Sequence, residues 1–267
     1  TQTPDYILPA TAVRLQDRLH LSRTALALDI NLGCSGYVYG LQVLASLLSA
    51  GGLKRGLLLV GDTSSKIISA RDRSVATLFG DAGSATALEF AAGAGAMHFD
   101  FGSDGSGYEA IIITHGGQRN PVDAQSLNLV DFGEGIERNQ CQLVLDGMEV
   151  FNFSIREVPK TIRQAMALAG KTIDDVDAFV LHQANRFMNE VIRKKLKIPA
   201  EKMPYSLGEF GNTSSASIPL TIVAGLRERV TASKMSLILS GFGVGLSWAT
   251  ACVNTDRIVC LPVVEVG

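Results

Sequence analysis

Short apolar runs alternate with longer amphipathic stretches along this chain, and the alternation limits the folds that are open to it. Apolar runs at 25–32, 57–61 and 178–181 predict buried strands. Amphipathic stretches at about 34–50 and 185–196 predict helices. Strands that alternate with helices in this way are typical of an α/β protein.

One pattern occurs twice. The first copy starts at Gly33-Cys34 and the second at Gly211-Asn212. In each copy a helix leads through a short polar loop into an apolar strand that ends in glycine, GLLLVG in the first and SLILSG in the second. The repeat predicts two related halves in which Cys34 and Asn212 stand at equivalent helix starts. Chance similarity between α/β segments is the alternative explanation.

The stretch between the two copies is polar and has little periodicity. Long connections of this kind are loops or linkers more often than packed elements. We therefore expect three parts, namely a first half at 1–115, a polar excursion at 116–145 and a second half at 146–267.

Composition excludes several classes of function. A net charge of -2 and a pI of about 6.1 give no overall attraction to nucleic acid or to an anionic membrane. No apolar stretch is long enough to span a membrane, and the first residues lack the features of a signal peptide. The four cysteines have no metal-ligand spacing, which favours a reducing, cytoplasmic setting and no metal site.

Cys34 is the first candidate for chemistry. It lies in NLGCSGYVYG, between an expected strand and an expected helix, and the glycines on both sides allow a sharp turn. The positive end of a helix dipole favours a thiolate, so a cysteine at a helix start is a candidate nucleophile at neutral pH. A buried structural cysteine is the alternative.

Two further side chains stand where α/β proteins place their chemistry. His182 follows the strand AFVL, and the C-terminal ends of parallel strands carry active sites. Asn212 lies in GEFGNTSSAS, a turn rich in small residues, where a helix cap is the alternative role. The glycines of SGFGVGLSW do not match a dinucleotide motif, but their turn can present backbone amides to an oxyanion.

Four motifs, GCSGYVYG, LHQAN, GNTSSAS and GFGVGLSW, occur in the order seen in β-ketoacyl-acyl-carrier-protein synthase III, and the chain resembles this family from TPDYILPATA to SWATACV. The resemblance implies a thiolase-like α/β fold, with two pseudo-symmetric βα halves in a layered αβαβα arrangement. It also implies that the chain lacks the N-terminal quarter of the family, so that the first half is incomplete.

The resemblance implies a decarboxylating condensation of an acyl-coenzyme A primer with malonyl-acyl carrier protein, which initiates fatty acid synthesis. Cys34 matches the nucleophile that carries the acyl group, and His182 and Asn212 match the pair that stabilises the enolate of the extender. The backbone amides of Cys34 and Gly245 match the oxyanion hole. No metal or redox cofactor is implied, because coenzyme A and phosphopantetheine thioesters are the substrates.

Residues for substrate and partner binding follow from the same resemblance. Those that match substrate-binding positions are Leu8, Arg73, Phe79, Asn185 and Phe242. Leu8 is expected to reach across a homodimer interface, Phe79 and Phe242 have a plain core role as the alternative, and Asn185 has a helix cap. Cationic residues after LHQAN are candidates for docking an acidic acyl carrier protein, with a solvated helix end as the alternative. They are Arg186, Arg193, Lys194, Lys195 and Lys197.

Two other functions stay open. A related acyltransferase or condensing enzyme of secondary metabolism would use the same three catalytic residues on another substrate. A non-catalytic subunit that pairs with an active paralogue has no chemical reason to retain Cys34, His182 and Asn212. A thiolase proper needs a second catalytic cysteine, and none of the other three cysteines lies in a glycine-rich catalytic motif.

Overall fold

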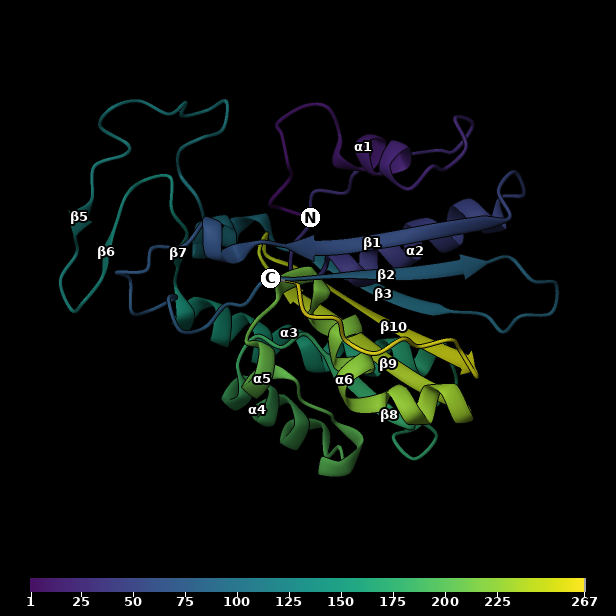
Figure 1. Ribbon diagram of the computed structural model, residues 1–267. Coiled ribbons are helices and arrows are strands. Elements are labelled where there is room, and N and C mark those ends of the chain that lie inside the picture. Colours follow the sequence, from purple (N-terminus) through teal and green to yellow (C-terminus); the bar gives the residue numbers. More distant parts are fainter. Residues whose placement is uncertain (267) are drawn as a thin grey trace.

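The computed structural model describes residues 1–266, and Figure 1 shows the order of the helices and strands. The α-helices are α1 (Thr11–Arg18), α2 (Gly36–Ser49), α3 (Gly147–Leu168), α4 (Arg186–Leu196), α5 (Leu207–Phe210) and α6 (Ser217–Ala232). The strands are β1 (Arg55–Asp62), β2 (Ala82–Glu89), β3 (His98–Ser103), β4 (Ile111–Ile112), β5 (Val130–Asp131), β6 (Glu137–Arg138), β7 (Val144–Leu145), β8 (Ala178–Leu181), β9 (Lys234–Gly243) and β10 (Ser247–Asp256). Short 3-10 helices are η1 (Ser64–Lys66), η2 (Gly105–Ala110), η3 (Ala200–Lys202) and η4 (Ser214–Ala216).

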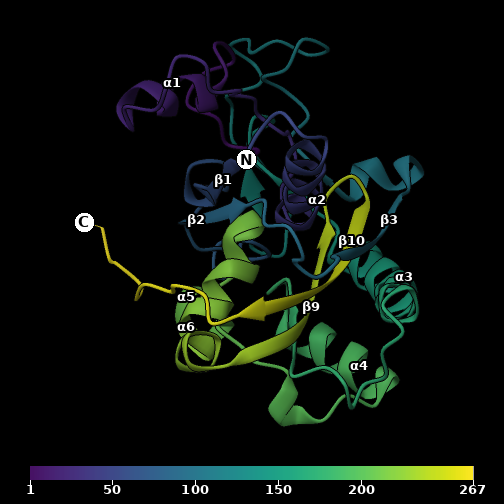
Figure 2. The ribbon, with the colours of Figure 1, turned by 90° about the vertical axis from the view of Figure 1, so that its right-hand side faces the viewer.

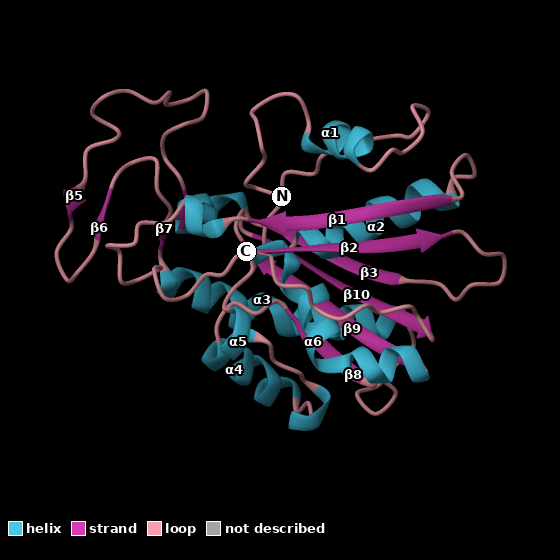
Figure 3. Cartoon of the chain, viewed as in Figure 1, coloured by secondary structure: helices cyan, strands magenta, loops and turns pink. Residues whose placement is uncertain are grey.

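Two sheets organise the molecule. The larger sheet has the strand order β3-β10-β9-β8, in which β8 and β9 are parallel and β10 is antiparallel to both of its neighbours. β1 and β2 form a separate antiparallel pair. Figure 3 colours the strands of both sheets, with β1 and β2 above the strands of the larger sheet in this view.

Helices α2 and α6 lie between the two sheets. Their buried side chains, such as Val38 and Ile218, pack in one apolar cluster with residues of β1, β8, β9 and β10. α3 and α4 cover the other face of the larger sheet and pack around Phe179 in a second cluster. In Figure 2, α3 and α4 lie on the opposite side of β9 from α6. The described residues therefore form four layers, in the order strand, helix, strand, helix.

Four of the five layers that the resemblance implies are thus present in residues 1–266. α1 lies above β1 in Figure 1, but it buries none of its side chains and does not complete a fifth layer. The order helix, strand, antiparallel strand occurs as α2-β1-β2 and again as α6-β9-β10. This recurrence agrees with the repeat in the sequence, while the expected domain boundaries stay predictions.

Most elements expected from the sequence are present. The helix predicted at 34–50 is α2, and the helix predicted at 185–196 is α4. The apolar runs at 57–61 and 178–181 lie in β1 and β8. Apolar periodicity identified them because each packs an apolar face or run into one of the two clusters.

The strand predicted at 25–32 is wrong. This segment forms no strand, and Leu26 and Leu28 are exposed. A strand needs a neighbour for its backbone groups, and within residues 1–266 no strand pairs with this segment. Its Asp29 instead accepts two backbone N–H groups from the first turn of α1, so the segment is tied to that helix.

The polar excursion at 116–145 folds back against the first half of the chain. Its strands β5 and β6 pair with each other. Arg138 donates to the buried carboxylate of Asp72 at 2.8 Å, and its guanidinium lies 4.5 Å from the centre of the Phe132 ring. A buried carboxylate needs such a partner, so this ion pair fixes the excursion to the segment after β1.

Three properties of residues 1–266 bear on function classes. None of their helices combines the length and the apolar character that crossing a membrane requires. No three His, Cys, Asp or Glu side chains among them are grouped to hold a metal ion. Their four cysteines are free thiols.

The packing predicts a large effect of one core substitution. Phe153 of α3 is 2% exposed, and its ring centre lies 5.5 Å from that of Trp248. Phe153→Ala should lower the free energy of unfolding by about 3–5 kcal/mol, because it loses buried surface and leaves a cavity. Urea denaturation followed by circular dichroism measures the loss.

The matched control for this substitution is Phe90→Ala, at a phenylalanine that is 56% exposed. It should change the free energy of unfolding by less than ~1 kcal/mol. Equal losses in the two variants would contradict the packing described for α3.

Candidate active site

Cys34 lies two residues before α2, where β9 ends beside the turn. A side chain on Gly243 would approach the Cys34 sulfur to 2.8 Å, and one on Gly241 would approach the Cys34 carbonyl oxygen to 2.8 Å. Both distances are too short for a non-bonded carbon. The two glycines therefore allow β9 to pass directly against the turn that holds the thiol.

Burial raises the pKa of the Cys34 thiol to about 11. Hydrogen bonds from the backbone of Val244 and the hydroxyl of Ser214 oppose this rise, and the negative charge of Asp62 adds to it. The thiol is therefore protonated at neutral pH. The expected thiolate is wrong for the free protein, because removal of the sulfur from water outweighs the helix dipole and the hydrogen bonds.

His182 follows the last residue of β8 and is buried. Its Nδ1 lies 2.7 Å from the hydroxyl of Ser217, the first residue of α6. The Nδ2 of Asn189 donates to the His182 carbonyl oxygen at 3.0 Å, and Phe242 presents its ring edge-on to the imidazole at 5.6 Å. Contacts on several sides thus fix the position of the ring.

The imidazole is neutral at physiological pH. Burial lowers the pKa of His182 to about 4, although the backbone of Ser214 and the charge of Asp62 act in the opposite direction. When the Ser217 hydroxyl donates to Nδ1, the ring proton lies on Nε2. In this tautomer Nε2 is the donor, and a substrate oxygen would compete with the Ser214 backbone for its proton.

Asn212 is buried in the turn before η4. Its backbone N–H donates to Leu78 at 2.9 Å and its carbonyl accepts from Gly80 at 3.0 Å, which makes a short parallel bridge with the segment after β1. Its Oδ1 accepts the backbone N–H of Ser214 at 2.9 Å. The Oδ1 is therefore occupied within the turn, and the Nδ2 is the atom left to donate to a ligand.

The preceding residue, Gly211, makes this turn possible. Its φ is 67°, a left-handed conformation that side chains disfavour, and a Cβ there would lie 2.9 Å from the Leu78 carbonyl oxygen.

Ser214 joins the three predicted catalytic residues. Its hydroxyl lies within hydrogen-bonding reach of both the Cys34 thiol and the Asp62 carboxylate, its backbone faces the His182 imidazole, and its N–H binds the Asn212 side chain. The structure therefore brings together the thiol, the imidazole and the amide that the motifs singled out.

Sequence reasoning missed four residues that contact this cluster, namely Asp62, Ser214, Ser217 and Val244. The run of small polar residues in GNTSSAS was the one signal for the two serines.

Three other predicted residues lie at the same place. Phe79 forms the bridge with Asn212, and Phe242 packs against His182. Gly245 follows Val244, whose backbone is the one that meets the thiol. The assignment of the Gly245 amide to an oxyanion hole stays a prediction.

The remaining substrate-binding candidates lie at the surface. Leu8 is exposed in the loop before α1, and Arg73 is exposed and lies 3.7 Å from Glu134 of the polar excursion. The Oδ1 of Asn185 accepts the N–H groups of Phe187 and Met188, so this side chain caps α4. The cap was the alternative role for Asn185, and its substrate contact stays a prediction.

The cationic residues of α4 differ in their availability. Arg193 is 17% exposed and forms an ion pair with Glu190 at 2.8 Å. Arg186 stacks over the Tyr205 ring at 5.2 Å. Lys194, Lys195 and Lys197 are exposed at the C-terminal end of the helix. The lysines therefore carry the solvent-accessible positive charge of this helix end, whereas the charge of Arg193 is paired.

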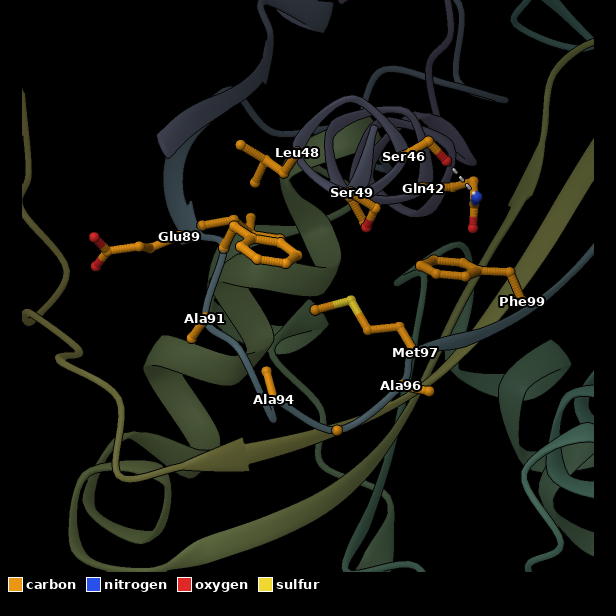
Figure 4. A pocket seen from close by; sticks show the side chains of 14 residues that line it. Gln42, Ser46, Leu48, Ser49, Glu89, Ala91, Ala94, Ala96, Met97 and Phe99 are labelled. Atoms are coloured by element: carbon orange, nitrogen blue, oxygen red, sulfur yellow. Dashed lines mark hydrogen bonds between the residues drawn. The ribbon is translucent and has the colours of Figure 1, made fainter. Parts of the chain in front are cut away.

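A surface hollow lies away from this cluster. Figure 4 shows it between the C-terminal half of α2 and the connection from β2 to β3, with Ser46, Met97 and Phe99 on its walls. Cys34 precedes the other end of α2, a helix of 14 residues and ~21 Å. The hollow is therefore separate from the candidate active site.

Comparisons with known proteins agree with this geometry. The model of 3-oxoacyl-[acyl-carrier-protein] synthase III matches residues 28–105, and that of the C-terminal part of the same enzyme matches residues 166–255. β-Ketoacyl-[acyl-carrier-protein] synthase III of Desulfitobacterium hafniense is 34% identical over 258 residues, which cover 96% of this chain and 75% of the relative. That of Synechocystis sp. is 35% identical over 254 residues, which cover 95% and 74%.

A solved structure gives the same result. The crystal structure of a 3-oxoacyl-(acyl-carrier protein) synthase from Burkholderia xenovorans LB400 has a TM-score of 0.90 and 45% identity, and the match covers 98% of this chain and 73% of that one. The chain belongs to the β-ketoacyl-[acyl-carrier-protein] synthase III family. The thiolase-like α/β fold and the assignment to an enzyme family are therefore confirmed. Cys34 lies in the first matched segment of this synthase III chain, and His182 and Asn212 lie in the second.

The raised pKa of Cys34 predicts how its alkylation depends on pH. Burial disfavours the thiolate, so the rate of reaction with iodoacetamide should rise about tenfold per pH unit from about pH 7 to about pH 10. Peptide mass spectrometry measures the rate at Cys34, and Cys34→Ala gives the background from the other three thiols. A plateau in the rate near about pH 8 would contradict the raised pKa.

Proposed function

We propose that this chain catalyses a decarboxylating Claisen condensation of an acyl-coenzyme A primer with malonyl-acyl carrier protein, with Cys34 as the acyl carrier. The convergence of the Cys34 thiol, the His182 imidazole and the Asn212 amide on Ser214 carries this proposal. The product is a β-ketoacyl-acyl carrier protein, and the reaction initiates fatty acid synthesis.

The first step transfers the acyl group. The Cys34 sulfur attacks the thioester carbonyl carbon, a new sulfur–carbon bond forms, and the bond to the coenzyme A sulfur breaks. The thiol proton leaves with coenzyme A as its free thiol. Backbone N–H groups around the turn of Val244 and Gly245, with that of Cys34, would hold the oxyanion of the tetrahedral intermediate. A thiol of high pKa is a strong nucleophile once it loses its proton.

The second step condenses the two carbons. The malonyl carboxylate leaves as carbon dioxide, and its electron pair moves to form an enolate whose oxygen carries the charge. His182 and Asn212 would each donate a hydrogen bond to that oxygen, and the neutral state of His182 suits this role because it keeps the ring a donor without a formal charge. The enolate carbon then attacks the acyl carbonyl, a carbon–carbon bond forms, and the Cys34 sulfur leaves as a thiolate that takes a proton from solvent to restore the thiol. Neither step changes an oxidation state, so the reaction needs no redox cofactor, and the hydrogen bonds from His182 and Asn212 would stabilise the enolate without a metal ion.

The partners follow from this chemistry. The acyl-coenzyme A primer and the acidic acyl carrier protein would reach the site from the side of α4, where Arg186 and the three exposed lysines offer positive charge. A homodimer is proposed because Ile7 and Leu8 expose apolar side chains side by side in one loop. Four free thiols suit a reducing, cytoplasmic setting.

The acyl-carrier role of Cys34 predicts a covalent adduct. Intact-protein mass spectrometry after incubation with acetyl, butyryl and octanoyl coenzyme A should show a gain of one acyl group. Cys34→Ala should show none, because the acceptor sulfur is gone, whereas Cys141→Ala should acylate as the unchanged protein does. The primer that forms the adduct fastest shows which acyl chain length the pocket prefers.

Other outcomes of this measurement separate the alternatives. A folded protein without any adduct would support the non-catalytic subunit. An adduct that never condenses with malonyl-acyl carrier protein would support an acyltransferase or condensing enzyme of secondary metabolism.

The roles of His182 and Asn212 predict a split between the two steps. His182→Ala and Asn212→Ala should each lower condensation about 10²–10³-fold, because the enolate loses a donor, while acylation of Cys34 continues. Product formation and adduct formation are measured separately on folded samples. His98→Ala, at a histidine on β3, is the matched control and should affect neither step. Equal losses of acylation and condensation would contradict the assignment of both residues to the condensation step alone.

A further inference from the structure

Asp62 is a buried acidic residue to which neither the sequence motifs nor the proposed reaction assigns a role. It is the last residue of β1 and is 4% exposed. Burial of a carboxylate without a partner is unfavourable, so its surroundings must stabilise the charge.

Neutral donors from two distant parts of the chain bind this carboxylate. Its Oδ2 accepts the hydroxyl of Ser215 at 2.7 Å and the Ser215 backbone N–H at 3.3 Å. Its Oδ1 accepts the backbone N–H of Gln2 at 2.7 Å and the hydroxyl of Thr1 at 3.0 Å. Burial acts to raise the pKa of Asp62, but the hydrogen bonds from Gln2, Ser215 and Ser214 outweigh it, and the pKa is lowered. Asp62 is therefore ionised at neutral pH.

The Ser215 contact controls a strained turn. Ser214 has a φ of 49°, the left-handed region that a non-glycine residue rarely occupies. This conformation lets Ser214 face the Cys34 thiol while its N–H binds Asn212. Asp62 accepts hydrogen bonds from both the N–H and the hydroxyl of the next residue, Ser215. These two hydrogen bonds therefore hold the strained Ser214 in its conformation.

The carboxylate also acts on the cluster through its charge. Its negative charge raises the pKa of the Cys34 thiol and that of the His182 imidazole. His182 is the other titratable side chain of this cluster. Asp62 thus influences both the shape of the site and the protonation of its nucleophile.

We propose that Asp62 is a positioning residue of the condensing site, whose ionised carboxylate holds Ser215 so that Ser214 and Asn212 face Cys34 and His182. The inference rests on the proposed function and adds a residue to its machinery. Asp62 joins the first half of the chain to the turn of the second half that carries Asn212, and a carboxylate is required because every partner is a donor.

The test is Asp62→Asn, which keeps the shape and replaces one acceptor oxygen by a donor. That NH2 group must face the N–H of Gln2 or that of Ser215, so the turn shifts. The kcat of condensation should fall about 10–100-fold, with a smaller change in the KM for acyl-coenzyme A, because misplaced catalytic groups impair the chemical step more than binding. The alkylation of Cys34 should also shift to lower pH, since the negative charge near the thiol is gone. A residue with a purely structural role would leave that pH profile in place.

Two further variants keep the test decisive. Ser215→Ala removes one hydrogen bond from the other side of the contact, and it should lower kcat without shifting the alkylation profile. Asp62→Asn combined with Ser215→Ala should be no slower than Asp62→Asn alone, because both changes break the same contact. Asp177→Asn is the control, since Asp177 accepts the N–H of Ser236 beside the start of β8 and should leave kcat and the profile unchanged.

A folded Asp62→Asn variant with the kcat and the alkylation profile of the unchanged protein would overturn the inference. So would a double variant whose loss equals the product of the two single losses. If Asp62→Asn does not fold, an unchanged kcat in Ser215→Ala overturns it. Failure of the proposed function looks different, because the unchanged protein would then form neither adduct nor product while the alkylation profile would still report the charge of Asp62.

Discussion

The burial of α2 and α6 between the two sheets is the constraint on which the site depends. Both helices contribute to one apolar cluster with strands of both sheets, so neither can shift without opening the core. Because the turns before them adjoin, Cys34 and Ser214 meet although they are far apart in the chain. β8 adds His182 from the strand beside β9. A rigid core thus positions three reactive groups that lie on turns, and catalytic groups need this rigidity to act together.

Short-range sequence signals predicted this core well. The apolar run AFVL and the amphipathic helix after Asn185 follow from spacing alone, and the motifs around Cys34, His182 and Asn212 singled out three side chains that the structure brings together. The run at 25–32 has the same apolar character, yet it forms no strand, because strand formation requires a neighbouring strand and not only an apolar sequence. Apolar periodicity shows that a segment can form a strand, and the presence of a neighbouring strand decides whether the strand forms.

Long-range contacts escaped prediction for a physical reason. Asp62 and Ser215 are separated by 153 positions, and no local pattern links an aspartate at a strand end to a serine in a distant turn. The charges of α4 were misjudged for the same reason. The sequence presents Arg193 as a free cation, but in the structure it forms an ion pair with Glu190. In both cases the partner sets the chemistry of the group, and the partner becomes known only when the chain is folded.

The electrostatics of the cluster favour neutral groups at rest, and this suits a two-step reaction. Burial holds the thiol protonated and the imidazole unprotonated, and the charge of Asp62 opposes a second negative charge at Cys34. Once the sulfur carries an acyl group it is neutral, so Asp62 no longer acts against it. Negative charge then develops on the extender, where hydrogen bonds from neutral donors gain strength because water is excluded. In the proposed reaction, a site that resists a free thiolate can therefore still accept the enolate, because His182 and Asn212 would donate hydrogen bonds to the enolate oxygen.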